Sequence, residues 1–280
     1  MSSAEATVTR YESPTGWYEA TGAEPAAVLR PYVRAYWGRE ERSVRPVARL
    51  EVPYPDVIVT ISFGPEQRVD AASHSSFVAG IHEAAARTVH DGYVFGVQLA
   101  LTPLAAHALF RTPMHALASR TVELDDVLGA EAGRLASRLY ETPTWSGRFE
   151  ALDTFLGVRV AEAAQAPAEV AWAWRQLRRT RGRYPIGRLT SELGWSRKRL
   201  VTQFRERVGL APKTFARVLR FHHAVTLLRS GGDRGWCDLA LDCGYCDQAH
   251  FNRDFRAFAG MTPTEFASRL SPDDPGVSGG

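Results

Sequence analysis

Cysteine, lysine and long apolar runs are all scarce in this 280-residue sequence. Only three cysteines occur, all within ten positions, which excludes a framework of disulfide bonds. No apolar run approaches the ~20 residues that a membrane-spanning helix needs. The N-terminus, "MSSAEATVTRYESPTG", lacks the basic and then apolar order of a secretory signal. We therefore expect a cytoplasmic protein without membrane contact.

Catalytic signatures are also missing. The sequence has no Gly-rich phosphate loop, no nucleophile elbow and no paired general acid and base. Its first half does hold five histidines (His74, His82, His90, His107 and His115), with Glu83 close to two of them. Histidines spaced this loosely more commonly serve packing or solvation than metal binding. We expect no enzyme activity, no cofactor and no metal site.

What the sequence does have is an uneven distribution of charge. The 166 residues before Pro167 contain 15 Arg or Lys and 20 Asp or Glu, whereas the rest contains 19 and 11. The run from Arg175 to Arg220 is the most basic, with fourteen basic residues against only Glu192 and Glu206. A basic half beside an acidic half indicates a polyanionic partner for the second half alone, although an Arg-rich solvated surface would look similar.

Hydrophobic periodicity changes earlier in the chain, within the acidic half. Up to about residue 101, runs such as "VARLEVPYPDVIVTISFGP" are rich in β-branched and aromatic residues and are bounded by Pro and Gly, as strands are. From Leu104 onwards, apolar residues recur at steps of three and four, which predicts helices. We expect an α+β domain of strands followed by helices over 1–165, an all-α domain over 166–272, and a flexible tail over 273–280.

The all-α half contains an internal repeat. Phe204, Gly209, Pro212 and Phe215 recur 51 positions later as Phe255, Gly260, Pro263 and Phe266, and Ser196 and Leu200 recur as Asp247 and Phe251. Upstream the displacement is 50, relating Leu189 to Leu239 and Gly194 to Gly244. Eight matches in order, with a slip of one residue, indicate one supersecondary unit built twice.

Each copy predicts a helix-turn-helix. In the first, a helix over Ile186–Leu193 ends at Gly194, and Ser196 is suited to cap the next helix. Leu200, Phe204 and Val208 then recur every four residues and predict the buried stripe of that helix, opposite a polar face.

The second copy repeats this pattern. A short helix over Leu239–Cys243 is expected to end at Gly244, and Asp247 is expected to cap a helix that buries Phe251, Phe255 and Phe258. Between the copies, the segment from Pro212 to Ser230 has the periodicity of one long helix that could brace them. Two recognition helices held rigidly in this way would fit successive major grooves, about 34 Å apart on one face of a DNA duplex.

The motif Cys-x-x-Cys formed by Cys243 and Cys246 has a structural explanation within this repeat. Cys243 stands where the first copy has Leu193, and Cys246 is the inserted residue that accounts for the slip. Two cysteines with one downstream histidine do not match a common zinc spacing, and the βαβ setting of a thiol oxidoreductase is missing. We expect Cys243 to be a small buried hydrophobe and Cys246 to be the more exposed thiol.

These residues resemble a known family. The stretches "RLTSELGWSRKRLVTQFRERVGLAPKTFARVLRFHHAVTLLR" and "LALDCGYCDQAHFNRDFRAFAGMTPTEFASRL" are similar to the DNA-binding domain of the AraC/XylS transcriptional regulators. The resemblance covers roughly 170–270 and departs from the family mainly at Tyr245 and Phe266. Fragments such as "FVAGIHEAAARTV" resemble, less specifically, the sensor domain of some of these regulators, which implies signal sensing or dimerisation.

The resemblance implies a set of DNA-contacting residues. The base-facing positions correspond to Lys198, Val201, Thr202, Gln248, Ala249, Asn252 and Arg253, and phosphate contacts are assigned to Arg197, Arg205, His250 and Arg256. These residue types fit the role, since Asn and Gln can pair with adenine and Arg with guanine. The expected partner is double-stranded DNA; RNA polymerase, a small-molecule effector, and a monomeric or homodimeric state are left open.

Two alternatives also stay open at this point. The first is a regulator that responds to oxidation or metal through Cys243 and Cys246. The second is an enzyme in the first domain that the C-terminal half tethers to DNA. A deep pocket with converging titratable groups in the first domain would favour that second alternative.

Overall fold

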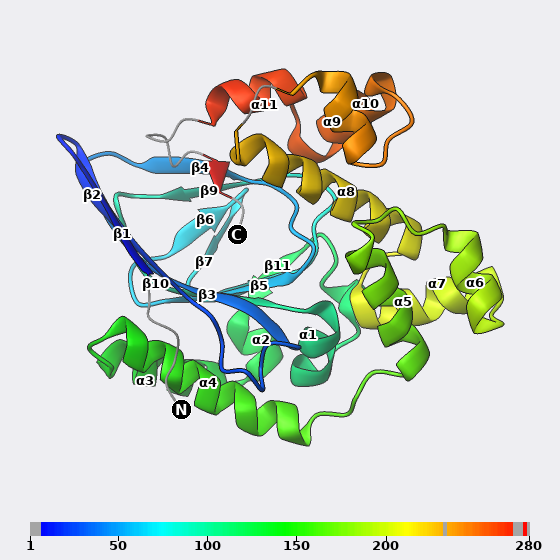
Figure 1. The fold of residues 1–280 in the computed structure, drawn as a ribbon. Helices are drawn as coiled ribbons and strands as arrows, with labels where there is room; N and C mark the ends of the chain where they lie inside the picture. Colours follow the sequence, from blue (N-terminus) through cyan, green and yellow to red (C-terminus); the bar gives the residue numbers. More distant parts are fainter. Residues whose placement is uncertain (1–6, 232–233, 271–276, 279–280) are drawn as a thin grey trace.

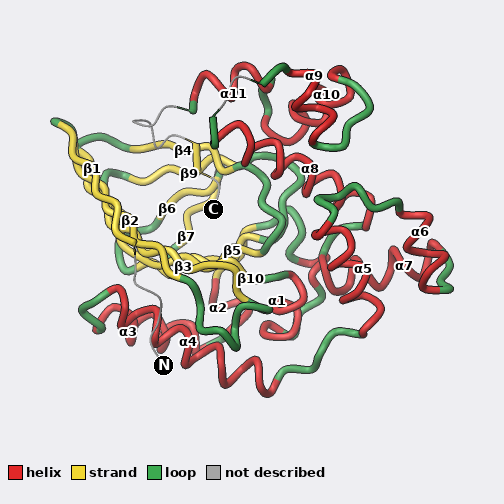
Figure 2. Tube along the Cα trace, viewed as in Figure 1, coloured by secondary structure: helices red, strands yellow, loops and turns green. Residues whose placement is uncertain are grey.

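The computed structural model describes residues 7–231, 234–270 and 277–278. Most strands lie within the first 101 residues, and the rest of the described chain is mainly helical (Figures 1 and 2). We call residues 7–162 the N-terminal part and residues 168–270 the C-terminal part. The prediction of strands followed by helices, and then of helices alone, is confirmed.

Two sheets form the N-terminal part. The larger has the order β1-β2-β3-β10-β5-β8-β11, with strands β1 (Thr7–Ser13), β2 (Gly16–Ala23), β3 (Val33–Ser43), β10 (Tyr93–Leu101), β5 (Val57–Ser62), β8 (Phe77–Ala79) and β11 (Thr121–Glu123). The smaller has the order β12-β4-β9-β6-β7, with strands β12 (Val277–Ser278), β4 (Val47–Glu51), β9 (Ala86–His90), β6 (Gln67–Val69) and β7 (Ala72–His74). The sheets face each other like the walls of an open barrel (Figure 1), and a cavity between them is lined from both.

Four helices cover the outer face of the larger sheet. They are α1 (Pro103–Phe110), α2 (Leu124–Leu128), α3 (Ala130–Glu141) and α4 (Trp145–Glu162), and a short 3-10 turn, η1 (Met114–Ala116), follows α1. Along β10, Val97, Leu99 and Leu101 are buried in the core shared with these helices, while Gln98 lines the cavity on the other side. This alternation is what a two-residue side-chain period produces. Asp125 and Asp126 lie in the first turn of α2.

The C-terminal part is helical throughout its described residues. It comprises α5 (Ala168–Arg179), α6 (Ile186–Leu193), α7 (Arg197–Val208), α8 (Pro212–Arg229), α9 (Trp236–Asp242), α10 (Gln248–Ala259) and α11 (Pro263–Arg269). Its core holds the residues predicted for it, including Leu200, Phe204, Phe255 and Phe258, and Trp172 and Trp195 pack at its edge. Within the described part of the chain, no helix is long and apolar enough to span a membrane.

The two parts share one buried cluster. Val52 and Ile81 of the N-terminal part belong to the same apolar core as Phe221 and Phe258 of the C-terminal part. The predicted boundary between residues 165 and 166 falls in the connection between α4 and α5 and stays a prediction. Of the predicted tail, residues 273–276 and 279–280 lie outside the described residues, and Val277–Ser278 pair in parallel with β4.

Candidate nucleic-acid interface

The turn between the two helices is built alike in both copies. Gly194 and Gly244 adopt φ values of +63° and +79°, the left-handed region that glycine occupies without steric cost. The next residue then reaches back five positions: the N–H of Trp195 donates to the carbonyl of Thr190 at 3.1 Å, and that of Tyr245 to Ala240 at 3.0 Å. This hydrogen bond is the signature of a Schellman C-terminal cap. Up to this point, equivalent residues of the two copies are therefore 50 positions apart in the sequence.

The single-residue slip follows immediately. Ser196 caps α7 by accepting a hydrogen bond from the N–H of Arg199, and Asp247 caps α10 by accepting one from His250. The cap follows Trp195 directly in the first copy, whereas Cys246 lies between Tyr245 and the cap in the second. Beyond it, the N–H of Gly209 bonds to Arg205 and that of Gly260 to Arg256, now 51 residues apart. The predicted position of the slip is confirmed.

The boundary of the second short helix differs slightly from its prediction. We expected Leu239–Cys243, but α9 runs over Trp236–Asp242 and Cys243 is its C-cap. The helix starts earlier because Trp236 packs at the edge of the C-terminal core. Cys243 is nevertheless buried, as predicted, and burial raises the pKa of its thiol to about 11.

Helix α8 holds the two units together. It is a single helix of 18 residues, about 27 Å long at 1.5 Å per residue, as the sequence predicted. Figure 1 shows α6 and α7 on one side of α8 and α9 and α10 on the other. Arg217 of α8 forms two hydrogen bonds with Asp254 of α10, and Phe221 packs against Phe255 and Phe258. These contacts fix α10 on the brace.

The predicted DNA contacts lie on the surface of their helices. On α7, Arg197, Lys198, Thr202 and Arg205 are exposed and Val201 is half-buried. On α10, Ala249, Arg253 and Arg256 are exposed, whereas Gln248, His250 and Asn252 are half-buried. Lys198, Thr202 and Arg205 follow one another at steps of four and three on α7, as Ala249, Arg253 and Arg256 do on α10, so each set shares one face of its helix. The structure thus brings each predicted set together on one surface.

The side chain of His250 contacts three neighbouring residues. Its Nδ1 lies 3.2 Å from Sγ of Cys246, and its ring meets Tyr245 edge to face. Its Nε2 lies 3.9 Å from the carboxylate of Asp254. A phosphate could reach only Nε2, so among the four predicted phosphate contacts His250 has the least freedom.

Contacts with the N-terminal part are the feature that sequence reasoning missed. The C-terminal end of α7 lies against η1 and α1: His115 is 3.5 Å from Glu206, and Gly209 packs against the backbone of Met114. The N–H of Ala85 donates to the carbonyl of Phe258 at the end of α10 at 2.7 Å. Neither contact covers the N-terminal half of its helix, which carries the predicted base contacts. No sequence signal marks these pairs, because their members are over ninety residues apart.

A buried ion pair also joins the two parts. Nη1 of Arg178 on α5 lies 2.5 Å from Oδ1 of Asp56, whose side chain is fully buried. Tyr54 meets His222 of α8 edge to face at 4.9 Å between ring centroids. Removing one partner of such a buried ion pair costs several kcal/mol of stability, because the other charge is left buried without compensation. These contacts therefore fix the orientation of α5 and α8 against the barrel.

The alternatives can be compared with this geometry. All three cysteines are free; Cys237 and Cys246 are exposed, and the described residues contain no group of three or more potential metal ligands. The barrel cavity does contain converging titratable groups, the feature named above as favouring an enzyme. Two of them are already engaged, however: Nη2 of Arg49 donates to both carboxylate oxygens of Glu41 at 2.8 Å, and Nη1 of Arg49 lies 3.0 Å from Nε2 of His90.

Two consecutive units of helix, glycine turn and capped polar helix define the C-terminal part as a double helix-turn-helix domain, a class that binds duplex DNA. The family model described as a helix-turn-helix domain matches residues 189–269, and a domain of unknown function, DUF6597, matches residues 22–123. Over residues 189–269 the chain is therefore similar to the helix-turn-helix domain of AraC/XylS-type regulators.

Individual relatives match only part of the chain. The transcriptional activator RhaR of Yersinia pseudotuberculosis is 36% identical over 67 residues, which is 24% of this chain and 23% of that protein. RhaR of Klebsiella pneumoniae is 31% identical over 86 residues, 31% of this chain and 30% of that protein. The matches therefore span less than a third of these relatives. Among solved structures, ToxT of Vibrio cholerae aligns with a TM-score of 0.46 at 12% identity, over 83% of this chain and 98% of that one.

Proposed function

We propose that this protein is a sequence-specific transcriptional regulator that places α7 and α10 in two major grooves of one DNA duplex. The observation that carries the proposal is the repeated unit: two identically turned and capped helices, each with an exposed polar and cationic face. Their N-terminal halves lie outside the contacts with the N-terminal part described above, and this is the end that a recognition helix directs at base edges. In this proposal residues 1–165 sense or oligomerise, residues 166–272 bind DNA, and the protein acts in the bacterial cytoplasm.

The contacts divide into two roles. Lys198, Val201, Thr202, Gln248, Ala249, Asn252 and Arg253 read bases, and Arg197, Arg205, His250 and Arg256 bind phosphates. Phosphate contacts supply affinity that falls with salt, whereas base contacts supply discrimination. The excess of basic residues after Pro167 supports this division, since only the DNA-binding half of the chain has a net positive charge.

A comparison of Arg253→Ala and Arg256→Ala tests both roles. Sites are first selected from random duplexes with the purified full-length protein, and mobility shifts are then measured over single-base variants of the best site. We expect Arg253→Ala to lose about 1–3 kcal/mol and its discrimination at one base pair. We expect Arg256→Ala to weaken all sites equally and to reduce the salt slope by about one.

Arg134→Ala, on exposed α3, serves as the matched control and should bind like the wild type. Uniform loss for Arg253→Ala would reassign that residue to phosphate. Unchanged binding in both α10 variants would refute the interface.

Control of DNA binding by the N-terminal part is a further element of the proposal. The contacts Arg178–Asp56 and Ala85–Phe258 connect the barrel to α5 and α10, so a change in the barrel's edge would change the position of both helices. The family resemblance adds a small-molecule effector, RNA polymerase as a partner, and a monomer or homodimer. The paired groups of the barrel cavity and the helix-turn-helix match support a regulator rather than an enzyme.

A further inference from the structure

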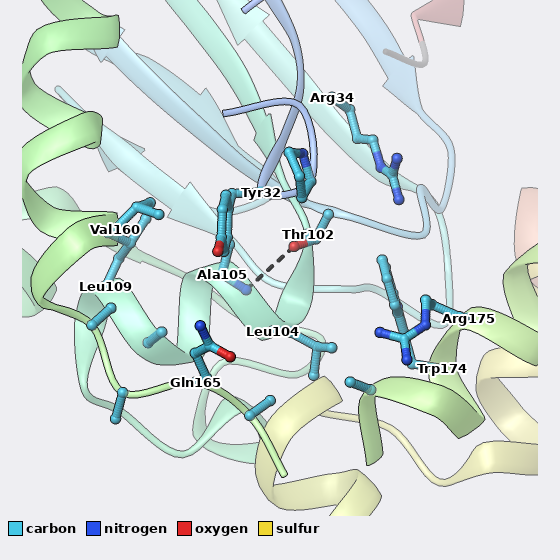
Figure 3. Close-up of a pocket in the computed structure, with 16 residues that line it drawn as sticks. Tyr32, Arg34, Thr102, Leu104, Ala105, Leu109, Val160, Gln165, Trp174 and Arg175 are labelled. Atoms are coloured by element: carbon cyan, nitrogen blue, oxygen red, sulfur yellow. Dashed lines mark hydrogen bonds between the residues drawn. The ribbon is translucent and has the colours of Figure 1, made fainter. Parts of the chain in front are cut away.

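A second and larger pocket lies outside the barrel, beneath the connection between α4 and α5. Its volume is about 390 Å³, within the range of 300–1,000 Å³ typical of ligand sites. Its walls come from α1, from the segment Pro31–Arg34, from residues 163–166 of the connection, and from α5 (Figure 3). Both parts of the chain therefore contribute to one pocket.

The pocket has an apolar body and a cationic end. Leu109 and Val160 lie at one end, and Arg34, Trp174 and Arg175 gather at the other (Figure 3). Both arginines are exposed, and the guanidinium of Arg34 lies over the Trp174 ring, 5.6 Å from its centroid. The described lining residues include no aspartate or glutamate.

The charges next to the pocket are unbalanced. Arg34 lies near Arg178 as well as Asp56, so two guanidiniums share the single buried carboxylate, and Asp56 is already in contact with Arg178. Burial, and then the positive charge of Arg178, lower the pKa of Arg34 below its usual value. Within the described residues, neither Arg34 nor Arg175 has a carboxylate in salt-bridge contact. An anion is therefore the group that this end of the pocket is built to receive.

The barrel cavity is a poorer candidate for a ligand of this kind. Its volume is about 110 Å³, less than a third of that of the outer pocket. Its cationic side chains Arg39 and Arg49 are already paired with Glu41.

We propose that the pocket beneath the α4–α5 connection binds a small amphipathic carboxylate, with its apolar body between Leu109 and Val160 and its carboxylate between Arg34 and Arg175. This deepens the proposed function, because it assigns the effector's chemical class and site. The ligand touches Tyr32 and Leu104 of one part and Trp174 of the other. It therefore stabilises the arrangement in which the two parts are packed together.

Calorimetric titration of the full-length protein with 4-phenylbutyrate, and with its neutral amide, tests the ligand class. The carboxylate should bind and raise the melting temperature in a concentration-dependent way, and the amide should do neither. Arg34→Gln and Arg175→Gln should each weaken the carboxylate about tenfold or more, the effect expected for losing a hydrogen bond to a charged group. Arg134→Gln is the control and should bind as the wild type does.

Ala108→Phe tests the location, because Ala108 lines the pocket and a phenyl ring there would occupy it. Binding should be lost while the melting temperature of the free protein stays close to that of the wild type. Equal affinity for acid and amide would overturn the proposal, and so would full affinity in the double arginine variant. If Ala108→Phe does not fold, the arginine variants alone decide.

Mobility shifts without ligand keep this result separate from the proposed function. A protein that shifts its selected site but binds no carboxylate overturns only the ligand proposal. A protein that binds the carboxylate but no specific DNA overturns only the regulator proposal.

Discussion

Arg217 of α8 and Asp254 of α10 form a bidentate ion pair. Nε of the guanidinium lies 3.1 Å from Oδ2 and Nη2 lies 2.9 Å from Oδ1. The side chain of Asp254 is 11% exposed and that of Arg217 32%. The bond to Asp254, the largest influence, raises the pKa of Arg217. This contact connects α8 to α10, the second helix proposed to contact bases.

Replacing Asp254 by Asn should therefore destabilise the protein and disturb α10. We expect a loss of about 1–3 kcal/mol in the free energy of unfolding, less than for a fully buried pair because Arg217 is partly solvated. Urea unfolding of Arg217→Ala, Asp254→Ala and the double variant measures the coupling directly. A coupling energy near zero would show that the pair does not hold α10.

The two N-caps should contribute equally, because the two units are built alike. Ser196→Ala and Asp247→Ala each remove the acceptor for a backbone N–H in the first turn, and each should cost about 1 kcal/mol in urea unfolding. Ser137→Ala, an exposed position within α3, is the matched control and should change stability by less than about 0.5 kcal/mol. If either cap variant matched this control, that unit would not depend on its cap.

Alkylation should distinguish the three cysteines. Cys237 and Cys246 are exposed, whereas Cys243 is buried and its pKa is raised to about 11, first by burial and then by Asp242. Because the thiolate is the reactive form, iodoacetamide at neutral pH should label the first two rapidly and Cys243 only after unfolding. Mass spectrometry of the native and urea-unfolded protein measures this. Rapid native labelling at Cys243 would contradict its role as a packed hydrophobe.

The stability of the protein should fall as the pH drops below neutral, in part because of His222. Burial is the first cause that lowers the pKa of this histidine, to about 4 from 6.5, and the positive charges of Arg178, Arg229 and His223 add to it. The unfolded chain takes up a proton as the pH falls through 6.5, while the folded chain does so only near 4. Stability from the neutral ring is thus present above pH 6.5 and is lost towards pH 4, up to about 3 kcal/mol.

His222→Gln tests this assignment because glutamine does not titrate. The free energy of unfolding, measured by urea at about pH 7 and pH 5, should depend less on pH in the variant than in the wild type. The same slope in both proteins would assign the pH dependence to other groups.

The helix-turn-helix units could be read from the sequence because their determinants are local. Gly194 and Gly244 take positive φ within their own turns, and Ser196 and Asp247 cap helices that begin at the next residue. The stripe of Leu200, Phe204 and Val208 needs only the helical period to be recognised, and all three are fully buried. The residues proposed to contact DNA are carried over from the family resemblance and stay a prediction.

The order of the strands in the barrel could not be predicted from the sequence in this way. The strand-rich composition predicted strands, but not that β10 would lie between β3 and β5, or that β4 and β9 would belong to a second sheet. Strand order depends on pairings between segments far apart in the chain, and many pairings satisfy the same alternation of apolar residues.

The sequence by itself determined the duplicated unit, the burial of its apolar stripes and the concentration of positive charge in one half, because each depends on residues a few positions apart. Only the tertiary structure decided that Arg178 would meet Asp56, 122 residues away, and that Arg34 and Arg175 would share a pocket. Such pairs form when packed elements fill space and neutralise charge together, and no local propensity encodes which distant partner will arrive.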